Sequence, residues 1–238
     1  MKIFEKINAK IKDRTAEPIT IAFLGDSVTQ GCFEHKIVDT AYDVKSAYST
    51  RLREILNLLY PFIPFNIINA GLSGDVASGG VNRLYRDVIS KSPDLVIVSY
   101  GLNDCTVGED GLGKYEKALD SIFSELFKEN IDTIFLTQNF CCTKTDPSLI
   151  DENLIDLSKK LISIQNGGIL KKYFERAKNL ASKYGVKVCD IYSVWEKLSQ
   201  AQVDTTDLLA NKLNHPIKEL HYYIAIKLLE TIFCFENK

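Results

Sequence analysis

Three short polar stretches each follow an apolar run, and together they contain groups suited to acyl transfer. Ser27 ends the stretch Gly25-Asp26-Ser27, and Gly71 and Asn103 follow the next two apolar runs. A serine hydroxyl attacks an ester when a base takes its proton, and the oxyanion that forms needs donors directed at it. A glycine amide is unobstructed, and an asparagine side chain offers an NH₂ group. We therefore interpret Ser27 as a nucleophile, with its own N–H, the Gly71 N–H and the Asn103 amide as oxyanion donors.

The base would be a histidine, and the sequence contains three. His35 lies shortly after the serine, and His221 lies inside the last predicted helix. His215 immediately precedes Pro216, and proline suits the first position of a helix. His215 would then lie in the loop entering that helix, at a sheet edge from which it can reach Ser27. We expect His215 to be the base, and His221 to pack or hydrogen-bond near Tyr222 and Tyr223.

Five short apolar runs rich in Val and Ile predict strands buried on both faces, as the strands of a parallel sheet are. Helical patterns separate them, which favours an α/β fold. In the flavodoxin-like order 2-1-3-4-5, strands two and three flank strand one, so the turns carrying Ser27, Gly71 and Asn103 would meet at one edge. Each motif alone is also explained as a turn or a helix cap; three at consecutive strand ends favour a site. The predicted strands are 19–24, 65–69, 95–100, 133–137 and 186–189.

The remaining stretches have apolar residues at helical spacing. Residues 1–14 carry an isoleucine every four positions among basic residues, which predicts an amphipathic helix and not a signal peptide. No repeat, low-complexity tract or linker occurs, so we expect one domain over residues 1–238, with the segment 1–17 packed on it. The predicted helices are 45–59, 79–90, 112–129, 149–161, 169–184 and 217–235.

The composition of the 238 residues, 45% hydrophobic and 25% charged, is typical of a soluble globular protein. A net charge of −2 does not favour nucleic acid as a partner. No run of about 18 apolar residues could span a membrane. The six cysteines include no CxxC pair and favour a reducing, cytoplasmic setting. No His and Cys residues show metal-ligand spacing, and the phosphate-binding patterns GxGxxG and GxxxxGK[ST] are absent.

The motifs resemble those of the SGNH hydrolases, the superfamily of GDSL-type esterases and lipases. The resemblance implies a flavodoxin-like three-layer α/β/α sandwich with a five-stranded parallel sheet. It also implies ester hydrolysis without cofactor or metal, commonly of an acetyl or other short acyl group, with Ser27, Gly71, Asn103 and His215 as the catalytic residues. Four stretches carry it in the family's order: Gly25-Asp26-Ser27, Asn69-Ala70-Gly71 through Gly74, Gly101-Leu102-Asn103-Asp104 and Asn214-His215-Pro216.

One position departs from the family. The residue three before the histidine is usually an aspartate that orients the imidazole, and here it is Lys212. Asp207, Asn211 or a backbone carbonyl could take this role, the last leaving a Ser–His dyad.

We therefore expect a serine esterase acting on a short-chain, in the first place acetyl, ester of a carbohydrate or small lipid. A catalytically silent binding module on the same fold is the alternative, because of Lys212. The loops 32–43 and 139–147 would form the pocket walls. Their mixed side chains fit a sugar ester, a short acyl group or a small lipid equally well; they are Phe33, Glu34, His35, Tyr42 and Phe140.

Overall fold

A parallel sheet of five strands forms the centre of the computed structural model, which describes residues 1–35 and 40–234. Its order is β4-β1-β5-β6-β7, which is the expected order 2-1-3-4-5 when the strands of this sheet alone are numbered. All five predicted strands are confirmed, with ends shifted by two residues at most. The strands are Ile19–Gly25 (β1), Phe65–Gly71 (β4), Leu95–Ser99 (β5), Asp132–Leu136 (β6) and Lys187–Cys189 (β7).

The register of the three strands at one side of the sheet brings their carboxyl ends level. Gly25 pairs with Gly71 of β4 on one side and with Ser99 of β5 on the other. Every residue of β5 is buried, whereas most of the edge strand β4 is only partly covered. The turns that follow these three strands therefore start from one edge of the sheet.

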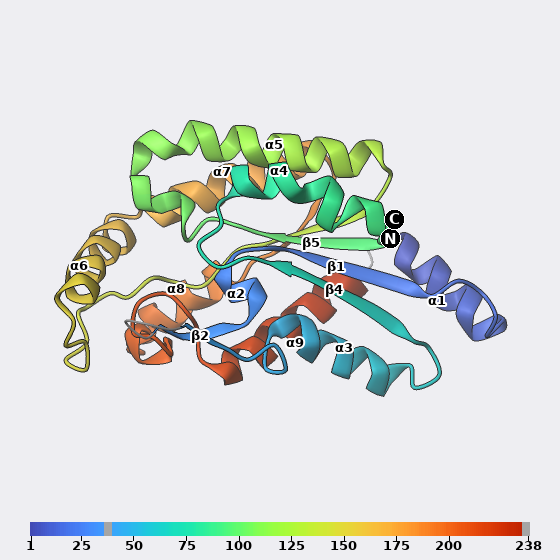
Figure 1. The fold of residues 1–238 in the computed structure, drawn as a ribbon, viewed down its shortest axis with the longest axis horizontal. Coiled ribbons are helices and arrows are strands. Elements are labelled where there is room, and N and C mark those ends of the chain that lie inside the picture. The colour runs from blue at the N-terminus through green and yellow to red at the C-terminus, as the bar shows by residue number, and fades with distance from the viewer. Residues whose placement is uncertain (36–39, 235–238) are drawn as a thin grey trace.

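Helices cover both faces of the sheet (Figure 1). In that view α4, α5 and α7 form the layer above it, and α3 and α9 lie below it. Helix α6 projects at the end where the strands terminate. The helices are Lys2–Lys12 (α1), Ser27–Gln30 (α2), Tyr48–Leu59 (α3), Ala77–Asp87 (α4), Leu112–Lys128 (α5), Glu152–Asn166 (α6), Ile169–Lys183 (α7), Tyr192–Gln200 (α8) and Lys218–Phe233 (α9).

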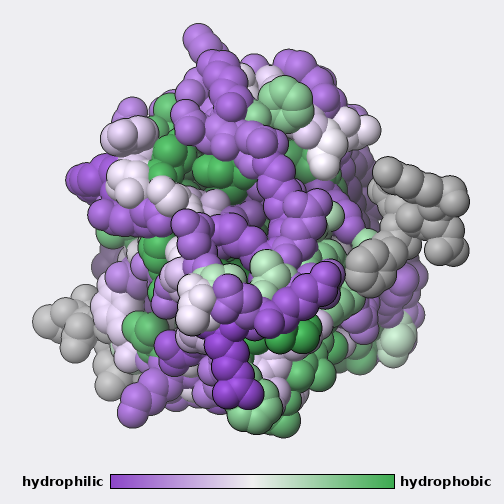
Figure 2. Space-filling view, turned by 90° about the vertical axis from the view of Figure 1, so that its right-hand side faces the viewer, coloured by the Kyte–Doolittle hydropathy of each residue, from purple (hydrophilic) through white to green (hydrophobic). Residues whose placement is uncertain are grey.

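Helix α1 contributes two of its isoleucines to the hydrophobic core of the sheet. Ile3 and Ile7 are buried in that core, whereas Ile11, one further step along the same pattern, is 60% exposed. The side of the molecule at the amino ends of the strands, near α1, is mainly hydrophilic with smaller hydrophobic patches (Figure 2). Across the described ranges, 1–35 and 40–234, the helices are all too short or too polar to cross a membrane.

Two helices and one β-hairpin were not predicted from the sequence. The four-residue helix α2 follows β1, and α8 has only two buried residues, Tyr192 and Trp195, so its apolar pattern is weak. Cys32–His35 (β2) and Thr40–Tyr42 (β3) pair as an antiparallel hairpin. The predicted end of the last helix, Phe235, lies outside the described residues, as do residues 36–39 of the predicted pocket wall.

Candidate active site

Ser27 is the first residue of α2 and lies directly after β1. The preceding Asp26 caps this helix, because its Oδ1 accepts the Val28 N–H at 3.0 Å. Gly31, with φ of +97°, ends the helix in a left-handed conformation that glycine adopts without strain. Within the part of the protein that the structure describes, the Ser27 N–H makes no hydrogen bond. The short helix therefore holds the hydroxyl at the sheet edge with its amide available.

His215 meets Ser27 although 188 positions separate them. His215 Nε2 lies 2.9 Å from Ser27 Oγ, and the residues are only 5% and 4% exposed. Loop contacts fix the histidine: its N–H donates to Asn211 Oδ1 at 2.9 Å and its C=O accepts the Ala210 N–H at 2.7 Å. Asn139 Nδ2 donates to the neighbouring Asn214 C=O at 2.8 Å. The structure thus brings together the two residues expected to be nucleophile and base.

The Gly71 amide is already engaged. Its N–H donates to Asn69 Oδ1 at 3.0 Å, an Asx-type turn that the sequence Asn-Ala-Gly could have suggested. Glycine is needed at this position for another reason. A Cβ on Gly71 would lie 2.2 Å from the Gln30 backbone nitrogen, so only glycine lets the serine loop approach β4 this closely. The structure thus makes Gly71 a spacer between β4 and the loop that carries Ser27.

Gly74 offers the open amide that was expected of Gly71. It is the third residue of a turn closed by the Asp75 N–H donating to the Leu72 C=O at 3.1 Å. Its φ of +76° is what a type II turn requires at this position. Over residues 1–35 and 40–234, no acceptor lies in hydrogen-bonding position to the Gly74 N–H. A Cβ on this residue would have no described atom within 4 Å.

Asn103 lies after β5 and is held by one of its two amide hydrogens. Its Nδ2 donates to the Asp75 C=O at 2.9 Å, which leaves the second N–H for another acceptor. Gln138 links this turn to the serine loop, because its Oε1 accepts the Leu102 N–H at 2.9 Å and its Nε2 donates to Asp26 Oδ2 at 2.8 Å. Sequence reasoning missed Gln138, which follows β6 and has no motif to mark it.

Two carboxyl groups at this edge are buried. Burial raises the pKa of Asp26 to about 6, although hydrogen bonds from Gln138 and Val28 favour the charged form. Burial also raises the pKa of Asp104 to about 7, against a hydrogen bond from the Ala77 N–H. The second carboxyl oxygen of Asp104 is buried without a partner among the described residues. The site therefore lies in surroundings that disfavour charge.

The residues considered for orienting His215 have other contacts. Asp207 is 62% exposed and its Oδ1 lies 3.0 Å from Lys212 Nζ. Asn211 Oδ1 accepts backbone N–H groups, those of Leu213, Asn214 and His215. Asn211 thus builds the histidine loop through the backbone, and Lys212 has the left-handed φ of +56° that this tight loop imposes.

His221 packs and hydrogen-bonds inside the protein, as expected, but its partners here are Tyr48 and Phe33. It is fully buried, its Nδ1 accepts the Tyr48 N–H at 3.1 Å, and its ring packs against Phe33 and Tyr48. Burial lowers the pKa of His221 to about 3, which keeps this imidazole neutral. The side chain of His35, in β2, lies outside the described part of the structure, as does that of Glu34.

Of the expected pocket-wall residues, Phe33 and Phe140 are packed inward. Phe33 lies against His221, and Phe140 lies against Tyr192 and Trp195. Of the three whose side chains the structure describes, only Tyr42, about half exposed, presents much surface. All six cysteines are free thiols, and only Cys234 is exposed. Among the described residues, no group of three His, Cys, Asp or Glu side chains is positioned to hold a metal ion.

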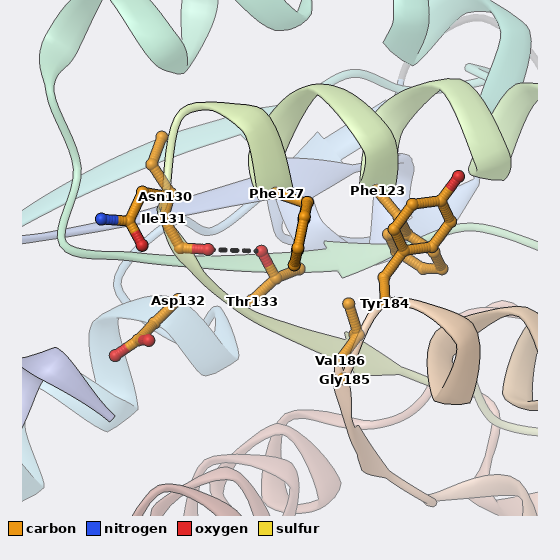
Figure 3. A pocket seen from close by; sticks show the side chains of 9 residues that line it. All are labelled: Phe123, Phe127, Asn130, Ile131, Asp132, Thr133, Tyr184, Gly185 and Val186. Atoms are coloured by element: carbon orange, nitrogen blue, oxygen red, sulfur yellow. Dashed lines mark hydrogen bonds between the residues drawn. The ribbon is translucent and has the colours of Figure 1, made fainter.

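A separate hollow of about 250 Å³ lies at the other end of the sheet, where β6 and β7 begin. Figure 3 shows its aromatic side chains, Phe123, Phe127 and Tyr184, on one side and the Asp132 carboxylate pointing away from them. Thr133 Oγ1 donates to the Ile131 C=O at 3.2 Å, and the Asn130 N–H donates to the Phe127 C=O at 3.0 Å. None of the described residues that line the hollow is a histidine, cysteine or serine.

The fold and this arrangement of residues define a hydrolase-type site with a serine and a histidine on an α/β sheet. Residues 23–221 match the model of the GDSL-like Lipase/Acylhydrolase family. The protein therefore belongs to this family, as the four motifs predicted. A search of curated proteins found no match.

Solved structures with the same fold include several esterases. An acetyl xylan esterase, AlAXEase, is 22% identical with a TM-score of 0.67, and the match covers 90% of the present protein and 100% of that one. A lipase/acylhydrolase from Enterococcus faecalis is 18% identical with a TM-score of 0.68, over 90% of the present protein and 95% of that one. A two-domain esterase (CEX) active on acetylated mannans is 20% identical with a TM-score of 0.66 over 95% of the present protein. The present protein spans 52% of the length of that two-domain esterase.

Proposed function

We propose that this protein is a serine esterase that removes a short acyl group, acetyl in the first place, from a carbohydrate or a small lipid. The observation that carries the proposal is the 2.9 Å contact between Ser27 Oγ and His215 Nε2 in a nearly buried setting. A nucleophile within hydrogen-bonding distance of a base is what covalent catalysis requires. The structures of similar fold named as acetyl xylan and acetylated mannan esterases support an acetylated carbohydrate as substrate.

In the proposed mechanism, His215 Nε2 takes the proton of Ser27 as Oγ attacks the ester carbonyl carbon. The carbonyl oxygen becomes an oxyanion that accepts hydrogen bonds from the Ser27 N–H, the Gly74 N–H and the second N–H of Asn103. The alcohol leaves with the proton held by His215. Water then attacks the acyl-serine, again with His215 as base, and releases the acid.

Gly74 replaces Gly71 in this scheme because of their hydrogen bonds. The Gly71 N–H is bound to Asn69 Oδ1, and giving it to an oxyanion would leave that oxygen short of a donor. The Gly74 N–H donates to no acceptor among the described residues, so it can bind an oxyanion without breaking another hydrogen bond.

The decisive test is hydrolysis of p-nitrophenyl esters of graded acyl length and of acetylated sugars by the wild type and Ser27→Ala. We expect acetyl esters to be preferred and the variant to lose activity by about 10⁴-fold or more, since the nucleophile is absent. Ser199→Ala, which removes an exposed hydroxyl on α8, is the control and should retain full activity. Substantial activity in Ser27→Ala would refute the assigned nucleophile.

Labelling with a fluorophosphonate probe distinguishes an esterase from the alternative, a catalytically silent binding module, which was considered because of Lys212. An activated serine reacts covalently with this probe, so the wild type should be labelled at Ser27 and His215→Ala should not. A wild type that is folded but unlabelled would favour the binding module.

A further inference from the structure

Arg83 is a buried cation whose donors bind the ends of two neighbouring strands. The side chain, from α4, is 8% exposed. Nη2 donates to the Gly25 C=O at the end of β1 at 2.9 Å, and Nη1 donates to the Ala70 C=O near the end of β4 at 2.6 Å. A buried guanidinium costs free energy unless its donors are satisfied, and its rigid fork suits several acceptors at once. One side chain thus ties together two strand ends of the site.

The same guanidinium forms a closed triangle with Asp75 and Tyr100. Arg83 Nε donates to Asp75 Oδ2 at 2.8 Å, and Nη2 donates to Tyr100 Oη at 2.8 Å. The Tyr100 hydroxyl donates in turn to Asp75 Oδ2 at 2.9 Å. Gly80 on α4 leaves the room for this ring, because a Cβ there would lie 2.6 Å from Tyr100 Oη. The triangle joins α4, the residue after β5 and the turn after β4.

Each proposed oxyanion donor is connected to this cluster by one or two residues of the chain or by one hydrogen bond. Gly25 precedes Ser27 by two residues, and Asp75 directly follows Gly74. The backbone carbonyl oxygen of Asp75 accepts the hydrogen bond from Asn103 Nδ2 at 2.9 Å. The Gly25 C=O also accepts the Leu72 N–H at 3.0 Å, at the start of the Gly74 turn. The Ser27 amide, the Gly74 amide and the Asn103 carboxamide are thus all connected to the guanidinium of Arg83 through neighbouring residues and hydrogen bonds.

We propose that Arg83, with Asp75 and Tyr100, is a positioning residue that fixes the three oxyanion donors relative to one another. This inference rests on the proposed function. Donors act on an oxyanion only when they are fixed in advance at its position, and a misplacement of about 1 Å can lower the rate about 100-fold. Substrate binding depends less on this geometry than the transition state does, so loss of positioning lowers kcat more than it raises KM.

Steady-state kinetics with p-nitrophenyl acetate test the proposal on Arg83→Lys and Tyr100→Phe. Lysine keeps the charge but not the fork, and phenylalanine removes one side of the triangle. We expect kcat to fall about 100-fold in Arg83→Lys and about 10-fold in Tyr100→Phe, with KM within about threefold of wild type. Arg86→Lys is the matched control, because Arg86 lies on the same helix with its side chain 77% exposed, and it should leave kcat unchanged.

A second measurement follows the donors directly, by ¹⁵N NMR of the Gly74 amide and the Asn103 side-chain amide. Both signals should shift and exchange faster with solvent in Tyr100→Phe and Arg83→Lys, and not in Arg86→Lys. Unchanged kcat with a lowered Tm would overturn the proposal, since Arg83 would then be only structural. If the wild type hydrolyses no ester, the proposed function fails separately, and unchanged donor signals in both variants would overturn the positioning role on their own.

Discussion

At the carboxyl ends of the strands, the turns surround buried polar side chains that are joined by hydrogen bonds. At the amino ends, the hollow of about 250 Å³ is lined largely by aromatic and aliphatic side chains. In the first region Ser27, His215 and Arg83 are nearly buried, whereas Leu72, Ser73 and Gly74 in the turn after β4 are exposed. The second is concave and accessible, with Phe127 65% exposed, but has few polar contacts among its lining residues.

A concave surface by itself therefore does not mark the candidate site in this fold. Burying Asp26, Arg83 and Asp104 costs free energy, which packing alone would not require. Functional sites typically contain buried polar groups of this kind with perturbed pKa values. Here they surround the contact between Ser27 and His215. Three variants test this contrast.

Asn103→Ala should have the largest effect. Losing one oxyanion donor is expected to lower kcat by about 10²–10³-fold, equivalent to about 3–4 kcal/mol of activation free energy. The measurement is kcat for p-nitrophenyl acetate. Asn130→Gly, at the amino-end hollow, is the matched control and should leave kcat unchanged. If kcat of Asn103→Ala were within threefold of the wild-type value, the Asn103 carboxamide would not be an oxyanion donor.

Asp104→Asn should change how stability depends on pH. The folded-state pKa of Asp104, about 7, lies above the ordinary 3.8, so the folded protein holds this proton more tightly than the unfolded state does. Its contribution to the free energy of unfolding is therefore fully present below pH of about 4 and is lost as the pH rises towards 7. The asparagine keeps an acceptor for the Ala77 N–H and removes the charge.

Urea unfolding between pH 4 and 8 measures this effect. Relative to the variant, the wild type should lose stability on the order of 2–4 kcal/mol across that range. Parallel pH curves for the two proteins would show that Asp104 does not titrate as its burial requires.

Phe127→Ala should have the smallest effect. The ring is mostly exposed at the hollow, so its removal should change the free energy of unfolding by about 0.5 kcal/mol or less and leave kcat unchanged. Thermal unfolding and the acetate assay check both. A marked loss of activity in Phe127→Ala would show that the hollow is coupled to the candidate site, which would contradict the difference between the two ends of the sheet.

Much of the architecture could be predicted because its signals are local. The apolar runs predicted all five strands of the parallel sheet, and turn residues after three of them located the site edge. Helix α8 was missed because only Tyr192 and Trp195 mark its buried face. The β2–β3 hairpin lies in a stretch predicted as a loop, since such short strands carry little periodic signal.

The residue types of the candidate site could be predicted from the sequence, since a serine, a carboxamide and a histidine are placed by elements whose order the residues indicate. The three-dimensional arrangement was needed to decide that Gly71 is a spacer and that the Gly74 N–H is the one left without an acceptor among the described residues. It also decided that Lys212 pairs with Asp207, and that Arg83 joins the ends of β1 and β4. The physical reason is that strand and turn patterns depend on residues a few positions apart. Which donors remain available at the site depends on acceptors brought in from other strands, and no local pattern specifies those.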